Sequence, residues 1–216
     1  DMIWCGFRYG AGYNDYLLCE FYLLTKEQRK TYMTRGKNNT LVRKLNNKKY
    51  NHFFNNKIDF NNTFSEYLKR DWLDMTKADL NDLKAFIKDK EYVMAKPASA
   101  NCGKGIEKIN LSEFTAESLF EYLKSKSIDL LEDYIVQNSK ISKIYPLSVN
   151  TLRVVSVYAN GKVNIVYAFI RIGNHNNVVD NLNHGGMTAP IDVKTGIVTH
   201  PAYDKEQNVY TRHPQT

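Results

Sequence analysis

The sequence has no long apolar run and only three cysteines, and both shortages exclude classes of protein. No stretch approaches the roughly 20 consecutive apolar residues that cross a bilayer as a helix, so we expect no transmembrane segment. The first residues lack a basic region followed by an apolar one, so we expect no signal peptide, and the start at Asp1 indicates a chain cut from something longer. Cys5, Cys19 and Cys102 form no C-x-x-C pair, which argues against a zinc site or a disulfide framework and favours a reducing, cytoplasmic location.

The net charge of +7 is unevenly distributed. Residues 1–108 carry 20 Lys and Arg against 13 Asp and Glu, whereas residues 109–216 carry ten of each. Most of the excess lies in Lys26–Lys57, where ten basic residues face the single acid Glu27. Such a block can bind an anionic polymer, or it can be a solvated helix face, and both interpretations stay open. No nucleic-acid-binding motif accompanies it, so we expect no nucleic-acid partner.

Apolar periodicity predicts helices in the first part of the chain and mostly strands after residue 91. Helical spacing indicates helices over 13–35, 63–73, 78–89 and 115–125, and Thr25 with Gln28 forms a candidate capping box. Short apolar runs indicate strands at 92–96, 106–111, 131–136, 151–158 and 163–172. This order predicts an α+β protein, divided into a mostly helical basic region 1–90 and two further regions, 91–137 and 138–216.

Asn160-Gly161 is the strongest hairpin signal in the chain, and it joins two strands that are apolar on both faces. We therefore expect a sheet that is covered on both sides. Arg153 and Arg171 lie within these strands, where an unpaired buried charge is costly, so each needs an anion from the protein or from a ligand. A two-residue turn puts the two arginines on opposite faces of the sheet, and a bulge puts them on one face; the sequence leaves this open.

The segment from Lys96 to Ile106 carries the clearest chemistry. Its small residues let backbone N–H groups approach phosphate oxygens, and its lysines add positive charge. It is not a Walker A loop, because that pattern needs Gly at position 98 and Ser or Thr at position 105, where this chain has Ala98 and Gly105. The segment predicts a phosphate-binding flap between two antiparallel strands, with an ordinary surface hairpin as the alternative.

The order of these residues along the chain resembles the ATP-grasp superfamily. It is most similar to the sugar-transfer-associated ATP-grasp family of bacterial polysaccharide loci. The most specific segments are Asn150-Thr151-Leu152-Arg153 and Asp180-Asn181-Leu182-Asn183-His184-Gly185-Gly186. The resemblance covers nearly the whole chain and implies an ATP-grasp fold, in which two α+β subdomains with mainly antiparallel sheets grip ATP.

The resemblance also implies a role for each matched residue. Lys57 and Lys96 match the two lysines that reach the phosphates, and Gly103, Lys104 and Gly105 match the flap that closes on them. The hinge strand, whose backbone binds adenine, corresponds to Glu132, Asp133, Tyr134 and Ile135. As catalytic residues, Arg153 and Arg171 match the basic side chains that meet the γ-phosphate and the carboxylate substrate. Solvated or structural charges remain the alternative for each.

Asp180 and Asn181 are candidate Mg²⁺ ligands, because both offer oxygen atoms; an Asx turn before Gly185-Gly186 is the alternative. In ATP-grasp enzymes the metal is usually held by an Asp and a Glu-x-Asn pair further along. We expect this pair, and with it the C-terminal end of the fold, to be missing from the chain.

The function implied is an ATP-dependent carboxylate–amine ligase that works through an acyl phosphate, with ATP and Mg²⁺ as cofactors. The resemblance extends the expected substrates to sugar acids or amino sugars of a cell-surface polymer. The alternative is a non-catalytic module that binds a nucleotide or a polyanion.

Overall fold

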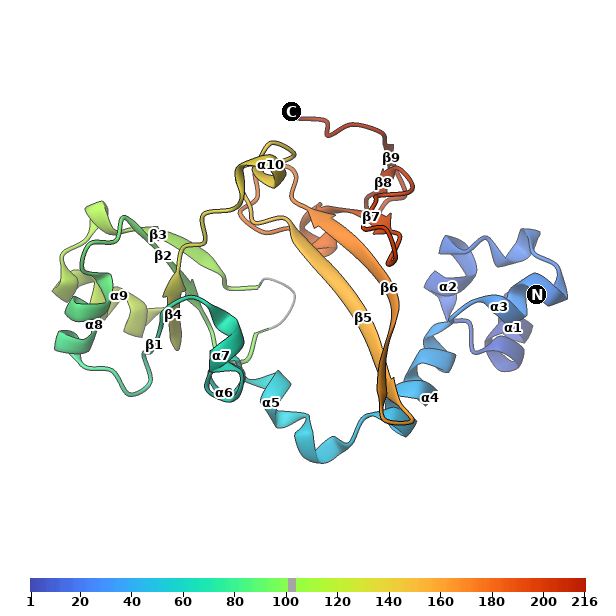
Figure 1. Ribbon diagram of the computed structural model, residues 1–216, viewed down its shortest axis with the longest axis horizontal. Helices are drawn as coiled ribbons and strands as arrows, with labels where there is room; N and C mark the ends of the chain where they lie inside the picture. Colours follow the sequence, from blue (N-terminus) through green and yellow to red (C-terminus); the bar gives the residue numbers. More distant parts are fainter. Residues whose placement is uncertain (101–103) are drawn as a thin grey trace. The chain divides into compact units, whose positions relative to one another are not determined.

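The computed structural model describes residues 1–100 and 104–216, which form two compact units, Asp1–Asn55 and Asn56–Thr216 (Figure 1). In the described residues, no helix is both long enough and apolar enough to pass through a bilayer.

The first unit is helical. It contains α1 (Met2–Tyr9), α2 (Tyr13–Leu18), the 3-10 helix η1 (Phe21–Leu23), α3 (Lys26–Thr31), α4 (Arg35–Leu45), η2 (Lys48–Tyr50) and α5 (His52–Asn55). Its small core is formed by Cys5, Tyr9, Ala11 and Phe21. Two of the ten basic residues of the Lys26–Lys57 block differ from the rest in their surroundings. Arg29 is buried against Asp1 at 2.8 Å within this unit, and Lys57 belongs to the second unit.

The single helix predicted over 13–35 is wrong, because the chain is interrupted after α2, after η1 and after α3. Glu20 takes the left-handed conformation, with φ of 46°, which ends α2 and its following turn. A new helix then begins at the predicted capping box: Gln28 N–H donates to Thr25 Oγ1, and Thr25 N–H donates to Gln28 Oε1. The capping box at Thr25 and Gln28 therefore marks the start of a separate helix, α3, inside the apolar pattern.

The second unit begins with α6 (Lys57–Thr63), α7 (Ser65–Leu68), β1 (Trp72–Asp74) and α8 (Leu80–Ile87). They are followed by β2 (Tyr92–Lys96), β3 (Glu107–Asn110), η3 (Leu111–Glu113), α9 (Ala116–Ser125) and β4 (Leu130–Asp133). The strands form an antiparallel sheet in the order β1-β4-β2-β3. The helix predicted over 63–73 is confirmed only as far as Leu68, the end of α7; Lys69 then has a φ of 52°, and the chain pairs with β4 as β1.

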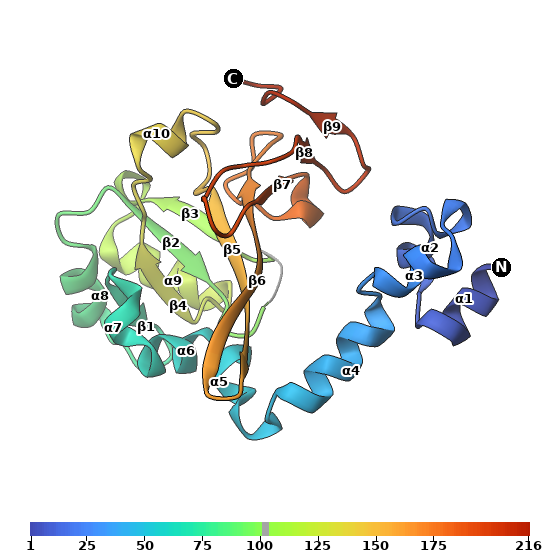
Figure 2. The ribbon, with the colours of Figure 1, turned by 45° about the vertical axis from the view of Figure 1, so that its right-hand side comes forward.

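The two faces of this sheet have different roles. Helices α8 and α9 cover one face, where Leu83, Leu119 and Leu123 pack against Val93, Ala95, Ile109 and Leu131 (Figures 1 and 2). The strand register places Met94 opposite Glu132, so these two side chains and Lys96 point to the other face. Helix α6 covers one end of that face through Ile58, which packs with Ala98 and Leu130.

The C-terminal part contains α10 (Ser139–Ser142), β5 (Thr151–Ala159), β6 (Lys162–Ile172), η4 (Leu182–His184), β7 (Met187–Ile191), β8 (Ala202–Tyr203) and β9 (Val209–Tyr210). The strands form a second antiparallel sheet in the order β5-β6-β7-β8-β9. Ile170, Ile172, Met187, Ala189 and Ala202 form the core on one of its faces together with Tyr145. The predicted turn at 192–196 is confirmed by the hydrogen bond from Gly196 N–H to the Asp192 carbonyl.

The β5–β6 hairpin has the predicted two-residue turn and also a bulge. Asn160 and Gly161 have φ of 53° and 76°, as a type I′ turn requires. Val166 is left out of the pairing between Val155 opposite Tyr167 and Ser156 opposite Ile165. The expectation of a sheet covered on both sides is wrong for this hairpin: β7 pairs only with residues 168–172, and Leu152, Tyr158 and Val163 are 60%, 70% and 66% exposed.

Candidate functional site

The second unit contains a cavity of about 300 Å³ that both of its sheets line, here called the inter-sheet pocket. Lys96 and the segment from Glu132 to Ile135 line it from the first sheet. Thr151, Arg171, Asp180 and Asn181 line it from the second sheet and the following loop. The pocket therefore brings together most of the residues that the sequence singled out, from positions as much as 85 residues apart in the numbering.

Glu132 is the most tightly held residue of the pocket. The residue is only 3% exposed. Its carboxylate accepts hydrogen bonds from Asn61 at 3.1 Å and Arg70 at 2.9 Å, and it forms a short ion pair with Lys96. Burial alone would raise the pKa of Glu132, but the bond from Arg70 and the charge of Lys96 lower it from 4.5 to about 2. The carboxylate is therefore charged at neutral pH and fixes the Lys96 ammonium at the pocket wall.

Lys57 organises the loop that follows β2. Its ammonium donates to the carbonyls of Pro97, Ala98 and Ala100 at 2.8, 3.4 and 2.6 Å, and its backbone N–H donates to Ala98 at 2.9 Å. Burial, followed by the repulsion of Lys96, lowers the pKa of Lys57. A ligand phosphate would have to replace these carbonyls to bind the Lys57 ammonium.

The predicted flap lies between two paired antiparallel strands, because Lys96 ends β2 and Glu107 begins β3. Lys104 is exposed, and Gly105 has a φ of 69°, a left-handed conformation that glycine adopts without strain. Gly103 lies outside the described residues.

The predicted hinge follows directly after β4. The Asp133 carboxylate forms an ion pair with Lys90 at 2.6 Å and accepts a hydrogen bond from the Asp71 N–H, so this side chain is engaged on the helix-covered face. Lys108 lies 4.0 Å from the centre of the Tyr134 ring. Within the described chain, no hydrogen bond engages the backbone of Ile135. Ile135 therefore offers one free donor and one free acceptor beside the pocket.

Arg153 and Arg171 share one face of the second sheet, which settles the choice that the sequence left open. Arg153 pairs with Phe169 and Thr151 pairs with Arg171, because the bulge at Val166 shifts the register by one residue. Arg171 donates to Thr151 Oγ1 at 2.9 Å and 2.7 Å and lies 3.5 Å from Asp180. Arg153 is exposed, and no carboxylate of the described residues forms an ion pair with it.

The predicted metal ligands Asp180 and Asn181 both line the inter-sheet pocket, and Asp180 is already engaged by protein groups. Asp180 is buried, and its Oδ2 accepts hydrogen bonds from the backbone and the hydroxyl of Thr151 beside Arg171. The described residues contain no cluster of three or more His, Cys, Asp or Glu that could hold a metal ion. Asp180 acts as a hydrogen-bond acceptor that fixes Thr151 and Arg171, and Asn181 lines the pocket beside it.

The expectation that the chain lacks the letters Glu-x-Asn is wrong, because Glu206-Gln207-Asn208 has them. This tripeptide forms the turn between β8 and β9. There Asn208 donates to Asp204 from its backbone at 2.9 Å and from its side chain at 2.8 Å. It does not line the inter-sheet pocket, so the match to the family pattern is one of letters only.

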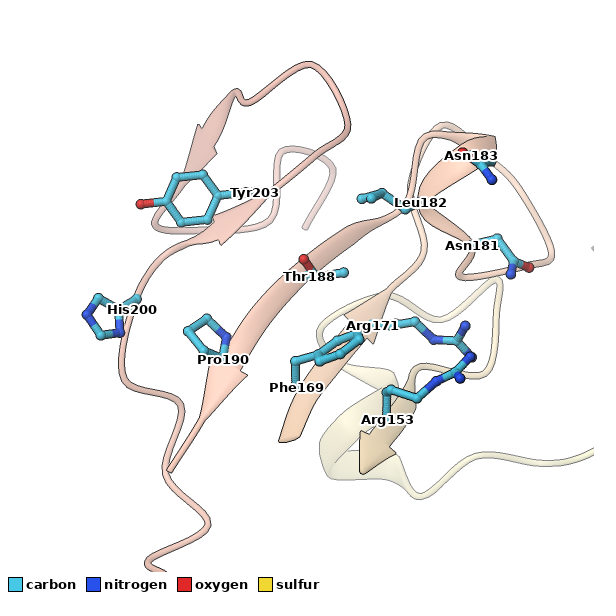
Figure 3. Close-up of a pocket in the computed structure, with 10 residues that line it drawn as sticks. All are labelled: Arg153, Phe169, Arg171, Asn181, Leu182, Asn183, Thr188, Pro190, His200 and Tyr203. Carbon is cyan, nitrogen blue, oxygen red and sulfur yellow. The ribbon is translucent and has the colours of Figure 1, made fainter. Parts of the chain in front are cut away.

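A second and larger cavity, of about 1140 Å³, lies over the exposed face of the C-terminal sheet and is here called the sheet pocket (Figure 3). It shares Arg171 and Asn181 with the inter-sheet pocket. Its other lining residues are Arg153, Phe169, Leu182, Asn183, Thr188, Pro190, His200 and Tyr203. In Figure 3 the side chains of Arg153 and Arg171 turn toward one another at one end of this cavity.

Sequence reasoning missed several residues of both pockets. Asn61 and Arg70 bind Glu132 from 71 and 62 positions away, and a single sequence has no signal for such a pairing. Ser148 lines the inter-sheet pocket with its hydroxyl buried and without a hydrogen-bond partner among the described residues. Tyr203 belongs to the two-residue strand β8, which pairs with β7 at Thr188, and His200 lies just before this strand.

The two sheets with a lysine- and arginine-lined pocket define a nucleotide-gripping fold of the ATP-grasp class. The sequence profile of the family described as "Sugar-transfer associated ATP-grasp" matches residues 27–216, and the chain belongs to this family. No curated protein matches the chain significantly in sequence. Membership implies an ATP-dependent activity of the ligase type, and the family generally uses ATP and Mg²⁺.

Proposed function

We propose that this chain binds ATP in the inter-sheet pocket and uses it to join a carboxylate to an amine. The observation that carries the proposal is the convergence of Lys96, the hinge after β4 and Arg171 on one pocket. Adenine would bond to the free backbone groups of Ile135, and the phosphates would extend toward Lys96 and Arg171. The Ser148 hydroxyl, which has no hydrogen-bond partner in the described part of the chain, adds one more polar group for a ligand in the same pocket.

The reaction we infer has two steps. A carboxylate oxygen of the substrate attacks the γ-phosphorus, the bond to the β-phosphate oxygen breaks, and ADP leaves. An amine then attacks the acyl carbon, phosphate leaves, and the amine nitrogen loses a proton to give the amide. Arg171 is suited to both steps, because it stabilises negative charge on phosphoryl and acyl oxygens at a position fixed by Thr151 and Asp180.

Calorimetric titration with a non-hydrolysable ATP analogue in the presence of Mg²⁺ tests the nucleotide site. We expect saturable binding that weakens at least tenfold, by about 1.4 kcal/mol, in Lys96→Ala. Lys90→Ala is the matched control, since Lys90 also forms an ion pair with a β4 carboxylate but does not line the pocket. Equal affinity of the wild-type chain and Lys96→Ala would contradict the placement of the phosphates.

The catalytic part is tested separately from binding. Release of ADP that depends on both a carboxylate and an amine would support the ligase. Nucleotide binding without ADP release under any such condition would favour the alternative, a module that binds nucleotide without turnover.

An anionic polymer is a proposed additional partner of the first unit. Within that unit, a hollow of about 660 Å³ is lined by Arg8, Lys37, Arg43 and Lys44. We expect binding of an acidic polysaccharide that falls steeply as salt is raised, because exposed charges are screened beyond about 10 Å at 0.1 M ionic strength. Binding that is unchanged in the double variant Arg43→Gln, Lys44→Gln would exclude this surface.

A further inference from the structure

We propose that the sheet pocket is the binding site for the carboxylate substrate, and that this substrate is a sugar ring bearing a carboxylate, of the uronic-acid class. This inference deepens the proposed function and rests on it for the role of the bound ring. The binding itself needs no nucleotide and can be measured alone.

The floor of the sheet pocket consists of two rows of side chains on one face of the C-terminal sheet. In one row, Arg153 pairs with Phe169, which pairs with Pro190. The neighbouring row runs from Arg171 through Thr188 to Tyr203. Paired residues of an antiparallel sheet project to the same side, so these six side chains form one continuous surface. The opposite side of the same strands is the buried core.

The charge of this surface fits one carboxylate. Arg171 lies 3.5 Å from Asp180, which offsets part of its charge, whereas Arg153 has no such partner among the described residues. Among the residues that the structure describes, no acidic residue lines the sheet pocket. The guanidinium groups face each other across one end of the cavity (Figure 3), where a carboxylate could accept hydrogen bonds from both. A free α-amino acid fits less well, because nothing in the pocket lining would neutralise its ammonium group.

The rest of the lining fits a ring with hydroxyl groups. Phe169, Pro190 and Tyr203 provide flat apolar surfaces against which the C–H face of a sugar can pack, and Tyr203 is 41% exposed. Thr188 and His200 add hydrogen-bonding groups between and beside them. A cavity with predominantly apolar walls and a few polar groups is typical of small-molecule sites. Its volume of about 1140 Å³ exceeds one sugar ring, so the ring can belong to a short chain.

The position of the arginines connects this site to the nucleotide. Arg171 and Asn181 line both the sheet pocket and the inter-sheet pocket. A carboxylate held between Arg153 and Arg171 therefore lies at the border with the pocket that takes the phosphates. Binding the sugar ring on the far side of this border would point its carboxylate toward the γ-phosphate.

Saturation-transfer NMR on the whole chain, without nucleotide, tests the site with three probes: glucuronate, glucose and cyclohexanecarboxylate. We expect glucuronate to bind and the other two to bind at least tenfold more weakly. Arg153→Gln and Tyr203→Ala should each weaken glucuronate binding at least tenfold, and both residues are exposed, so the fold should survive. Lys90→Ala, outside both the sheet pocket and the inter-sheet pocket, should leave it unchanged.

Each other outcome overturns part or all of the inference. If glucose bound as tightly as glucuronate, the carboxylate would not contribute to recognition. If cyclohexanecarboxylate bound as tightly as glucuronate, the hydroxyl groups would not contribute. Binding of none of the three, or binding that ignores Arg153→Gln, would refute the site. Titration of the same preparation with the ATP analogue reports on the nucleotide pocket independently, so failure of one proposal is distinguished from failure of the other.

Discussion

Replacing Glu132 with Gln should destabilise the second unit at neutral pH and have no effect in acid. The substitution keeps the size of the side chain but removes the charge that Lys96 and Arg70 compensate. Because the pKa of Glu132 falls from 4.5 to about 2 on folding, and one pKa unit corresponds to about 1.4 kcal/mol, the charged form contributes roughly 3 kcal/mol. Lys96 and Arg70 are about one fifth exposed, so water can solvate them in the variant and limit the loss.

The pH dependence has a definite sign. The pKa is lower in the folded state, so the contribution is complete above pH 4.5 and is lost as the pH falls from 4.5 toward 2. Urea unfolding of wild type and Glu132→Gln should therefore differ by about 3 kcal/mol at pH 7 and converge near pH 2. Trp72, which pairs with Glu132 across β1 and β4, reports on this region once Trp4→Phe has removed the other tryptophan.

Glu117→Gln is the control for the loss of an ion pair without burial. Glu117 forms a 2.6 Å ion pair with Lys84, but its side chain is 59% exposed, and we expect no clear change in the urea midpoint. A difference between wild type and Glu132→Gln that stays constant from pH 7 to pH 3 would refute the reasoning, because packing rather than charge would then account for it.

Three further substitutions test the packing and the hairpin. Gly173→Ala should cost several kcal/mol in urea unfolding, because its Cβ would lie 2.6 Å from the Tyr145 ring and would also collide with Ser148; an unchanged midpoint would exclude this contact. Leu119→Ala, at a fully buried core position, should lower the free energy of unfolding by about 2–5 kcal/mol, and a loss below 1 kcal/mol would show that the core closes around the gap. Gly161→Val should destabilise the hairpin by about 1–2 kcal/mol, seen as faster amide exchange in β5 and β6, since φ there is 76°; unchanged exchange would contradict the turn type.

Much of the fold could be predicted because its signals are local. The structure confirms four of the five predicted strands and the 115–125 helix nearly at their predicted bounds. It also confirms the turn at Asn160-Gly161, where both residues have a positive φ. The remaining strand, predicted over 131–136, ends at Asp133, where the chain leaves the sheet. The helix predictions over 13–35 and 63–73 failed at Glu20 and Lys69, which take left-handed conformations without being glycine or asparagine.

The site was predictable only in part. The candidate residues came from resemblance and order along the chain, and most of them line one pocket. Their partners were not predictable, because Asn61 and Arg70 reach Glu132 through tertiary contacts. The shared face of Arg153 and Arg171 was undecided as well, since the bulge falls at Val166, a residue with no special backbone preference to mark it.

The bulge at Val166 separates the hairpin into two regions with different tolerance to change in length. The part of the hairpin between the bulge and the Asn160-Gly161 turn forms an arm that β7 does not pair with. A residue added to or removed from both strands of this arm together would alter only its length. Between it and the site, a change of one residue in one strand would turn Arg153 or Arg171 to the opposite face. The protein can therefore acquire arms of different lengths while its paired arginines stay in place.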